Sequence, residues 1–270
     1  MLQLHGLEVS TLAWILSLLG ALSAHVSVNT LNEYFDFKSG LDLNTQRTPF
    51  SGGSGALPAL PQALYGTLMV GVVSLLLSII IGAFFVYQLG WFLLPIGLLG
   101  VFLVFAYTTW INQHPLLCLI APGLGFGPLM VMGSYWVMGA HYNEAVWLVS
   151  LVPFFLVNNL LLFNQYPDIK ADRQAGRRHL LIAHGTRVGV IIYGLFSLLS
   201  VLMMALLVVL GFIPALALLA LLPLPLAFYS LIGLAKHQES IAQYPQYLRS
   251  NVITTLATLV LFSLGIVLGA

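Results

Sequence analysis

The chain has 270 residues, of which 60% are hydrophobic and only 6% are charged. A soluble domain is roughly 45–50% apolar and about 25% charged, so this chain has too few charged side chains to cover a water-exposed surface. The net charge of +1 excludes a basic nucleic-acid binder, and the single cysteine, Cys118, excludes a disulfide framework or a thiolate metal site. The composition therefore predicts an integral membrane protein surrounded by the lipid bilayer.

Apolar stretches long enough to cross a bilayer follow one another along the sequence. The hydrocarbon core is about 30 Å thick and needs about 20 apolar residues per helix. Runs such as VVSLLLSIII lack the polar and apolar alternation of lipid-facing strands, so we predict an all-α, polytopic transmembrane helical bundle. The eight expected spans are residues 9–32, 62–87, 91–111, 115–139, 145–165, 186–210, 212–234 and 248–269.

These spans leave no polar region large enough for a separate soluble domain, so residues 1–270 are expected to form a single transmembrane domain. No Lys or Arg precedes the first apolar stretch, and no small-residue cleavage site follows it. We therefore expect no removable signal peptide.

The basic residues lie on one side of the predicted bundle. Each of them follows an odd-numbered span, and the opposite side has none. The positive-inside rule then places these loops in the cytoplasm and both termini outside. The basic residues are Lys38 and Arg47 after the first span, Lys170, Arg173, Arg177, Arg178 and Arg187 after the fifth, and Lys236 and Arg249 between the last two.

Acidic and amide side chains gather where two of these spans reach the cytoplasmic side. Each set lies on one helical face, and such oxygen ligands suit Mg²⁺, which binds one or two carboxylates together with phosphate oxygens. We therefore expect the two sets to face each other across a central cavity open to the cytoplasmic side. The sets are Asn29, Asn32 and Asp36 at the first span, and Asn164, Asp168 and Asp172 at the fifth.

Basic side chains interleaved with these acids fit a phosphate ligand, because Lys and Arg can neutralise phosphate oxygens. The alternative is that they form only exposed ion pairs, which contribute little and are common in cytoplasmic loops. Acids and amides that continue into an apolar span are costly there and are usually functional. We therefore favour a Mg²⁺-dependent diphosphate site at the membrane surface.

Three segments carry motifs. Residues 32–42 read NEYFDFKSGLD, residues 164–180 read NQYPDIKADRQAGRRHL, and residues 125–135 read GFGPLMVMGSY. The first two resemble the aspartate-rich motifs of the UbiA superfamily of intramembrane prenyltransferases, in the form found in its 1,4-dihydroxy-2-naphthoate branch. The third segment is a weaker match to an FGPL and GSY stretch of those enzymes. The spacing of the hydrophobic spans agrees along essentially the whole chain.

The resemblance implies Mg²⁺-dependent transfer of a polyprenyl group from an allylic polyprenyl diphosphate to an aromatic acceptor. It places the protein in a bacterial or archaeal cell membrane, in quinone-type biosynthesis, with 1,4-dihydroxy-2-naphthoate as the favoured acceptor. The implied catalytic metal ligands are Asp36 and Asp42 for one Mg²⁺ and Asp168 and Asp172 for another, with Asn32 and Asn164 completing or orienting the two shells.

The resemblance and the charge pattern together give candidates for substrate binding. His25 lies one turn deeper than Asn29 on the same face, which makes it a candidate for acceptor binding, although interhelical hydrogen bonding is the alternative. The Gly-rich segment 51–55 is expected to be a flexible linker or a lid. The diphosphate-binding candidates are Asn29, Lys38, Arg47, Lys170, Arg177 and Arg178.

The chain departs from the family pattern in several places. Glu33 stands where the first motif usually has Asp, and His179 stands where the second usually has Thr. The family resembles a nine-helix bundle whose first motif ends the second helix, so the resemblance implies that a first helix is missing here. Residues 111–126 contain no Asp, Glu, Lys or Arg in place of the G-x-G-E stretch of the naphthoate branch.

These departures keep other functions open. Another acceptor is one alternative: 4-hydroxybenzoate, a haem or chlorin side chain, or a glycerol phosphate. A transporter or a non-catalytic, lipid-binding membrane protein is a second alternative, from a different class. A transporter is expected to carry ionisable groups near the bilayer midplane, whereas the acids here lie mostly at one face.

Overall fold

The structure is a computed structural model that describes residues 10–139 and 143–270. Within these residues, eight segments are long and apolar enough to cross a membrane, which confirms the predicted class and number of spans. Residues 1–9 lie outside the described residues. They include the expected start of the first span at residue 9 and the residues on which the expectation about a signal peptide depends. The segments are Thr11–Lys38, Pro61–Leu89, Trp91–Thr109, Pro115–Val137, Glu144–Gln174, Thr186–Val209, Ala215–Gln243 and Pro245–Leu268.

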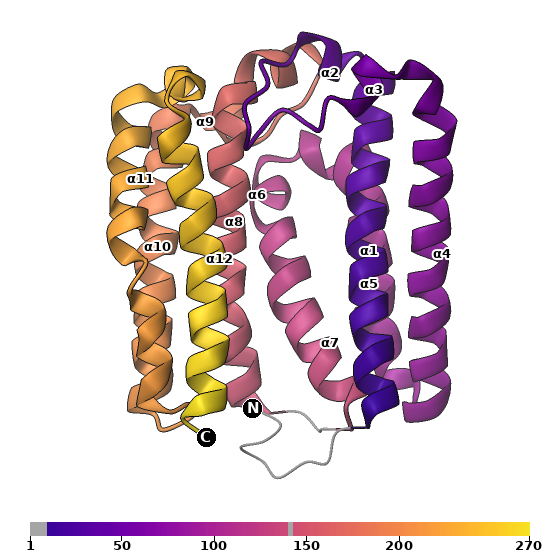
Figure 1. Ribbon diagram of the computed structural model, residues 1–270, viewed down its shortest axis with the longest axis vertical. Coiled ribbons are helices and arrows are strands. Elements are labelled where there is room, and N and C mark those ends of the chain that lie inside the picture. The colour runs from indigo at the N-terminus through magenta and orange to yellow at the C-terminus, as the bar shows by residue number, and fades with distance from the viewer. Residues whose placement is uncertain (1–9, 140–142) are drawn as a thin grey trace.

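The helices form two groups that run side by side (Figure 1). In one group α1 packs against α4 and α5, and in the other α8 packs against α10 and α12, with α6 and α7 between the groups. The bounds are α1 Thr11–Lys38, α4 Leu64–Leu89, α5 Leu94–Thr109, α6 Pro115–Leu124, α7 Met130–Val137, α8 Glu144–Gln174, α10 Thr186–Val209, α11 Leu224–His237 and α12 Pro245–Leu268.

The eight spans differ widely in how well they are packed. In the most apolar part of α8, 56% of the residues are buried, against 6% in α1. α8 packs against α6, which precedes it in the chain, and against α10 and α12, which follow it. α8 is therefore the central scaffold, whereas α1 is held mainly by its neighbours α4 and α5.

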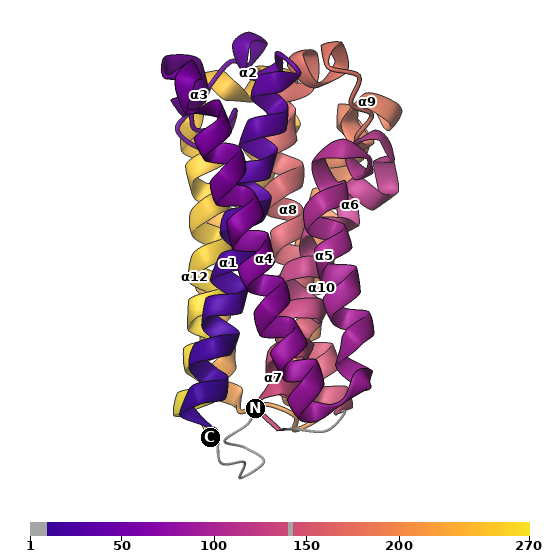
Figure 2. The same cartoon turned by 90° about the vertical axis from the view of Figure 1, so that its right-hand side faces the viewer.

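Short helices lie together at one end of the bundle (Figure 2). They are α2 (Leu41–Asn44), α3 (Ala56–Ala59) and α9 (Leu180–His184). The last turns of α1 and α8 reach this same end, whereas the C-terminus lies at the opposite one. The two predicted motifs, at the ends of α1 and α8, are therefore carried to the same face of the bundle.

Two helices extend beyond their predicted ends. The first span was expected to stop at residue 32 and the fifth at residue 165, but α1 continues to Lys38 and α8 to Gln174. Hydropathy marks only where a helix leaves the apolar layer, and the polar residues that follow keep helical hydrogen bonds. Both acidic motifs therefore lie on helical extensions that reach beyond the apolar stretches.

Two predicted spans are interrupted helices. Between α6 and α7 the chain forms a π-helical turn, Gly125–Leu129, which contains Pro128. The seventh span was expected as one helix over residues 212–234, but it consists of a 3₁₀ segment, Ala215–Leu221, followed by α11 after Pro223. Proline lacks an N–H and clashes with the preceding turn, which explains both breaks.

Candidate active site

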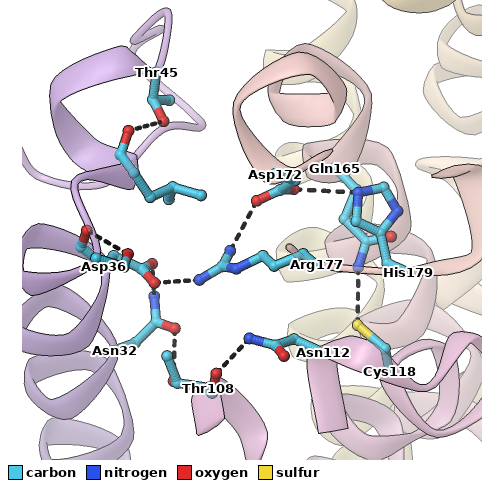
Figure 3. A network of polar contacts seen from close by, with 12 residues as sticks. Asn32, Asp36, Thr45, Thr108, Asn112, Cys118, Gln165, Asp172, Arg177 and His179 are labelled. Carbon is cyan, nitrogen blue, oxygen red and sulfur yellow. Dashed lines mark hydrogen bonds and ion pairs between the residues drawn. The ribbon is translucent and has the colours of Figure 1, made fainter. Parts of the chain in front are cut away.

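The two motifs meet at one arginine. The guanidinium of Arg177 lies between Asp36 of α1 and Asp172 of α8 (Figure 3). Its Nη2 pairs with Oδ1 of Asp36, and its Nη1 donates to Oδ1 of Asp172 at 3.0 Å. Both aspartates are buried, with 6% and 3% of their surfaces exposed. The structure thus brings together two segments that lie far apart in the sequence.

A glycine after each helix directs the chain back toward the site. Gly40 follows α1 with φ of 80° and leads into α2, which carries Asp42. Gly176 follows α8 with φ of 79°, and the next N–H, that of Arg177, donates to the carbonyl of Asp172 at 2.9 Å. Such left-handed backbone is favourable for glycine and strained for other residues. Gly40 and Gly176 therefore allow the chain to turn back toward the site without backbone strain.

Asn32 orients the first carboxylate. Its Nδ2 donates to Oδ2 of Asp36 at 2.9 Å, one helical turn away. Its Oδ1 accepts a hydrogen bond of 2.8 Å from the hydroxyl of Thr108 at the end of α5. Both polar ends of the amide are therefore used, and Asn32 ties the motif on α1 to α5 (Figure 3).

The second carboxylate has a histidine partner. Nε2 of His179 lies 3.2 Å from Oδ2 of Asp172, and only 2% of the His179 surface is exposed. Asp172 therefore lies between Arg177 and His179 (Figure 3). The backbone N–H of Arg178 donates to the carbonyl of Asn112 at 2.9 Å, which fastens this loop to the connection between α5 and α6.

Asp42 lies in a strongly negative environment. It is 5% exposed. Burial, followed by repulsion from Asp36 and Glu33, raises the pKa of Asp42 to about 6. Arg47 approaches it but donates from Nη2 to the Asp42 backbone carbonyl, at 3.1 Å, and not to the carboxylate. A cation bound beside this carboxylate would relieve the repulsion.

Three buried oxygens in the two motifs have no hydrogen-bond partner: Oδ2 of Asp42, Oδ1 of Asn164 and Oδ1 of Asp168. Leaving such atoms unsatisfied costs about 1–3 kcal/mol each. Carboxylate and amide oxygens are ligands that Mg²⁺ accepts, so the residues present fit this metal. Over residues 10–139 and 143–270, however, no three His, Cys, Asp or Glu side chains already form a metal-binding group.

The predicted diphosphate ligands are not all equally placed. The guanidinium of Arg177 lies between Asp36 and Asp172, and the other basic candidates belong to segments at the same end of the bundle. The side chains of Lys38, Lys170 and Arg178 are exposed, and Nζ of Lys38 lies 3.4 Å from the Tyr34 hydroxyl. Arg177 and Arg47 are therefore the two candidate cations that hydrogen bonds to site residues hold in place, whereas Lys38, Lys170 and Arg178 are exposed.

Asn29 is placed differently from the other diphosphate candidates. Its Nδ2 donates to the carbonyl of His25 at 2.8 Å, about two helical turns from Asp36. The structure therefore groups Asn29 with His25 and not with the basic residues. The rings of His25 and Phe126, the latter in the π-helical turn, form a T-shaped pair with centroids 5.6 Å apart. Both Asn29 and His25 remain exposed although they lie within the span.

Three residues that contact the motif aspartates, asparagines and arginines were not predicted as their partners: Thr108, Asn112 and His179. Thr108, at the end of α5, and Asn112, in the connection after it, lie in a stretch without Asp, Glu, Lys or Arg, and their contacts depend on how α5 is placed beside α1 and α8. His179 offered one signal, because it departs from the Thr usual at this position. In the structure Nε2 of that histidine lies 3.2 Å from Oδ2 of Asp172.

Comparison with known families gives a match over most of the chain. The model of the UbiA prenyltransferase family matches residues 1–253. The chain belongs to this family. Among characterised relatives, the 1,4-dihydroxy-2-naphthoate octaprenyltransferase of Bacillus subtilis (strain 168) is 28% identical over 191 residues. The alignment covers 68% of this UbiA family member and 58% of that enzyme, so the chain spans less than two thirds of its relative's length.

Solved structures of UbiA homologues share the fold. The homologue from Archaeoglobus fulgidus bound to DMAPP and Mg²⁺ superposes with a TM-score of 0.63 at 14% identity, covering 95% of this chain and 89% of that one. Its complex with GPP and Mg²⁺ gives a TM-score of 0.64 at the same identity and coverage. The homologue from Aeropyrum pernix K1, solved without ligand, gives 0.63 at 14% identity, covering 95% and 94%.

Proposed function

We propose that this UbiA family member transfers a polyprenyl group, within the membrane, from an allylic polyprenyl diphosphate to 1,4-dihydroxy-2-naphthoate. The observation that carries the proposal is the meeting of Asp36 and Asp172 at Arg177, beside unpartnered oxygens of Asp42 and Asp168. The naphthoate is the acceptor named for the Bacillus subtilis relative, and DMAPP, GPP and Mg²⁺ are the ligands of the Archaeoglobus fulgidus homologue.

The acids of both motifs would hold Mg²⁺. Asp42, Asn164 and Asp168 already present unpartnered oxygens, and Asp36 and Asp172 lie on either side of Arg177. Mg²⁺ held there would supply positive charge that makes the diphosphate a better leaving group, which departs with the electron pair of the bond between its oxygen and the allylic carbon. Asn32, whose oxygen is used by Thr108, would orient Asp36.

The basic residues would hold the diphosphate. Arg177 has five N–H donors, of which two face the carboxylates, so the remaining donors can bind phosphate oxygens. Arg47 donates to the backbone carbonyl of Asp42 and lies close enough to the Asp42 carboxylate to interact with its charge. Lys38, Lys170 and Arg178 are exposed at this end and would neutralise the outer oxygens.

The membrane-spanning part would protect the reacting carbon. After the diphosphate departs, the allylic carbon is cationic, and the electron-rich ring of the acceptor forms a bond to it and then releases a ring proton. The proposed transfer requires a chamber between the two helix groups, open at the motif end, that keeps water from that carbon. His25 and Phe126 lie along α1 and the π-helical turn and would contact the acceptor or the prenyl chain.

A transport function is disfavoured by where the charges lie. In the part of the chain that the structure describes, the Asp, Glu, Lys and Arg residues lie at or beyond the ends of the spans, away from their middles. Transporters commonly place such groups near the bilayer midplane. The distribution fits a reaction at one membrane face, with an apolar interior for the isoprenoid chain.

The proposed activity is tested with the purified protein in lipid. A polyprenyl diphosphate is supplied with a panel of acceptors that includes 1,4-dihydroxy-2-naphthoate and 4-hydroxybenzoate, and prenylated products are identified by mass spectrometry. We expect product with the naphthoate in the presence of Mg²⁺ and none after chelation. Product that survives chelation would contradict the metal assignment, and product with only another acceptor would contradict the substrate.

Asp168→Asn is the sharpest variant for this test. Because Oδ1 of Asp168 has no partner within the protein, removing its charge should leave the fold intact while turnover falls by at least about 100-fold. Glu239→Gln is the matched control, since Glu239 is an exposed acid on a separate segment of the same end and should retain full activity. Equal turnover in both variants would contradict the assignment of Asp168.

A further inference from the structure

Glu33 belongs to the first motif but has its own partner. The hydroxyl of Ser54 donates to Oε1 of Glu33 at 2.6 Å, and the backbone N–H of Ser54 donates to Oε2 at 3.3 Å. Hydrogen bonds to a carboxylate are among the stronger ones in proteins. Both oxygens of Glu33 are thus directed to the Gly-rich segment 51–55.

These two bonds fasten the segment to α1. The chain ahead of it closes on itself, because Thr48 N–H donates to the Ser51 carbonyl at 3.0 Å and the Thr48 hydroxyl accepts from Ser51 N–H at 2.9 Å. Across the described residues, the hydrogen bonds that join segment 45–60 to α1 are those between Glu33 and Ser54. Without the Glu33–Ser54 bonds, segment 45–60 would keep the turn between Thr48 and Ser51 but would have no hydrogen bond to α1.

The fastened segment packs on two residues of the candidate site. Gly53 has φ of 73°, and a Cβ there would lie 3.3 Å from Oδ1 of Asp42. Gly55 has φ of 75°, and a Cβ there would lie 2.5 Å from Nη1 of Arg47. The bare backbone therefore rests against the carboxylate and the guanidinium, which explains why glycine occupies both positions.

An acid at position 33 has an electrostatic cost. Glu33 repels the carboxylate of Asp42, which is already close to Asp36. A neutral side chain would avoid this repulsion. The position therefore calls for a role that needs two acceptor oxygens, and binding the hydroxyl and the N–H of Ser54 uses both of them.

We propose that Glu33 is a positioning residue, which holds segment 51–55 against Asp42 and Arg47 so that Asp42 keeps the orientation in which it would hold Mg²⁺ and Arg47 the one in which it binds the donor diphosphate. The inference rests on the proposed function, because it takes Asp42 and Arg47 as parts of the diphosphate site. Glu33 then acts through Ser54 and is not itself a metal ligand.

Ser54→Ala leaves the charge of Glu33 in place and removes the hydroxyl, which donates to Glu33 and also accepts from the Ala56 N–H at 3.0 Å, so it is read together with Glu33→Ala, which keeps the Ala56 bond. We expect KM for the polyprenyl diphosphate to rise about tenfold, equal to about 1.4 kcal/mol, while kcat changes by less than about twofold. Glu33→Ala should give the same increase, and the double variant no more than either single one. Ser54→Thr, which keeps the hydroxyl, should restore the wild-type KM.

Hydrogen exchange of the backbone amides in segment 51–55 reports on the same contact without catalysis. Exchange should become faster in Ser54→Ala and in Glu33→Ala, but not in Ser240→Ala, an exposed serine whose hydroxyl donates to the His237 carbonyl at 2.7 Å. Unchanged exchange in the first two variants would overturn the proposal.

Two further outcomes separate this inference from the proposed function. If Glu33→Ala loses kcat and needs more Mg²⁺ while Ser54→Ala matches the wild type, Glu33 binds the metal and the positioning role is overturned. If the wild-type protein transfers no prenyl group to any acceptor, the proposed function fails. The exchange measurement then still decides whether Glu33 holds the segment.

Discussion

Arg177 links two carboxylates that would otherwise face each other without compensation. It pairs with Asp36, which lies 141 residues earlier in the chain, and with Asp172, five residues earlier. Burial opposes the charge of the guanidinium, but the two carboxylates outweigh it and raise the pKa of Arg177 above its usual value. The residue is therefore a permanent cation at the point where the motifs meet.

Replacing this arginine tests how much the cation contributes. Arg177→Met removes the cation that two buried carboxylates share, so we expect the free energy of unfolding without Mg²⁺ to fall by roughly 3 kcal/mol. Added Mg²⁺ should raise the Tm of the variant more than that of the wild type, since the metal then compensates the same carboxylates. Arg173→Met, at an exposed position on the last turn of α8, is the control. Equal Mg²⁺ effects in all three proteins would contradict the pairing.

The sequence predicts the motif residues but not their protein partners. Asn32 with Asp36, and Asp168 with Asp172, are recognisable because helical spacing places each pair on one face. Thr108, His179 and Ser54 carry no comparable pattern. Their contacts arise from tertiary packing that brings α5, the loop after α8 and the Gly-rich segment beside these helices.

Among the elements, α6 and the π-helical turn approach α8 through glycine. A Cβ on Gly123 would lie 2.3 Å from the carbonyl oxygen of Phe154, and the Gly123 N–H donates to Oδ1 of Asn158 at 2.6 Å. Small residues at helix contacts allow such close approach in membranes, where dispersion and hydrogen bonds drive association. The contact places Phe126 and the end of α5 relative to α8.

A matched pair of glycines tests this contact. Gly123→Ala should lower the free energy of unfolding by about 1–3 kcal/mol, because the added methyl collides with the backbone of α8. Gly125→Ala should not, since nothing lies within 4 Å of the added methyl there. Thermal unfolding in detergent micelles measures both. Equal destabilisation by the two variants would show that α6 and α8 are less closely packed than described.

The number of spans was predictable because hydropathy measures the length of apolar segments directly. The breaks at Pro128 and Pro223 were not, although both prolines are visible in the sequence. An apolar run looks the same whether it forms one helix or two, and neighbouring helices decide how freed backbone groups are satisfied. The extensions of α1 to Lys38 and of α8 to Gln174 were not predicted either, because hydropathy does not report on backbone hydrogen bonds.

On the scale of the whole molecule, the sidedness of charge predicts orientation. The loops with Lys and Arg all lie at the end of the bundle that carries the motifs, and the positive-inside rule places that end in the cytoplasm. The opposite end carries Gln88 at the close of α4, while Gln246 begins α12 at the motif end. Both glutamines are exposed and can report on the two sides.

Cysteine labelling tests the orientation. Cys118 is buried and is the sole cysteine of the chain, so a Cys118→Ala background is suitable. A membrane-impermeant maleimide added to intact cells should modify Gln88→Cys, and it should modify Gln246→Cys only after the membrane is permeabilised. The reverse pattern would place the candidate site outside the cell.

The division into two helix groups has a consequence for biosynthesis. α1, α4 and α5 are contiguous in the chain and pack on one another, so they can associate in the membrane before α8 is made. Arg177 is synthesised 141 residues after Asp36, which at about 5–20 residues per second is a delay on the order of ten seconds. During that time Asn32, four residues away, is the partner that Asp36 already has. The Asn32 amide thus provides the Asp36 carboxylate with a hydrogen bond until Arg177 has been synthesised.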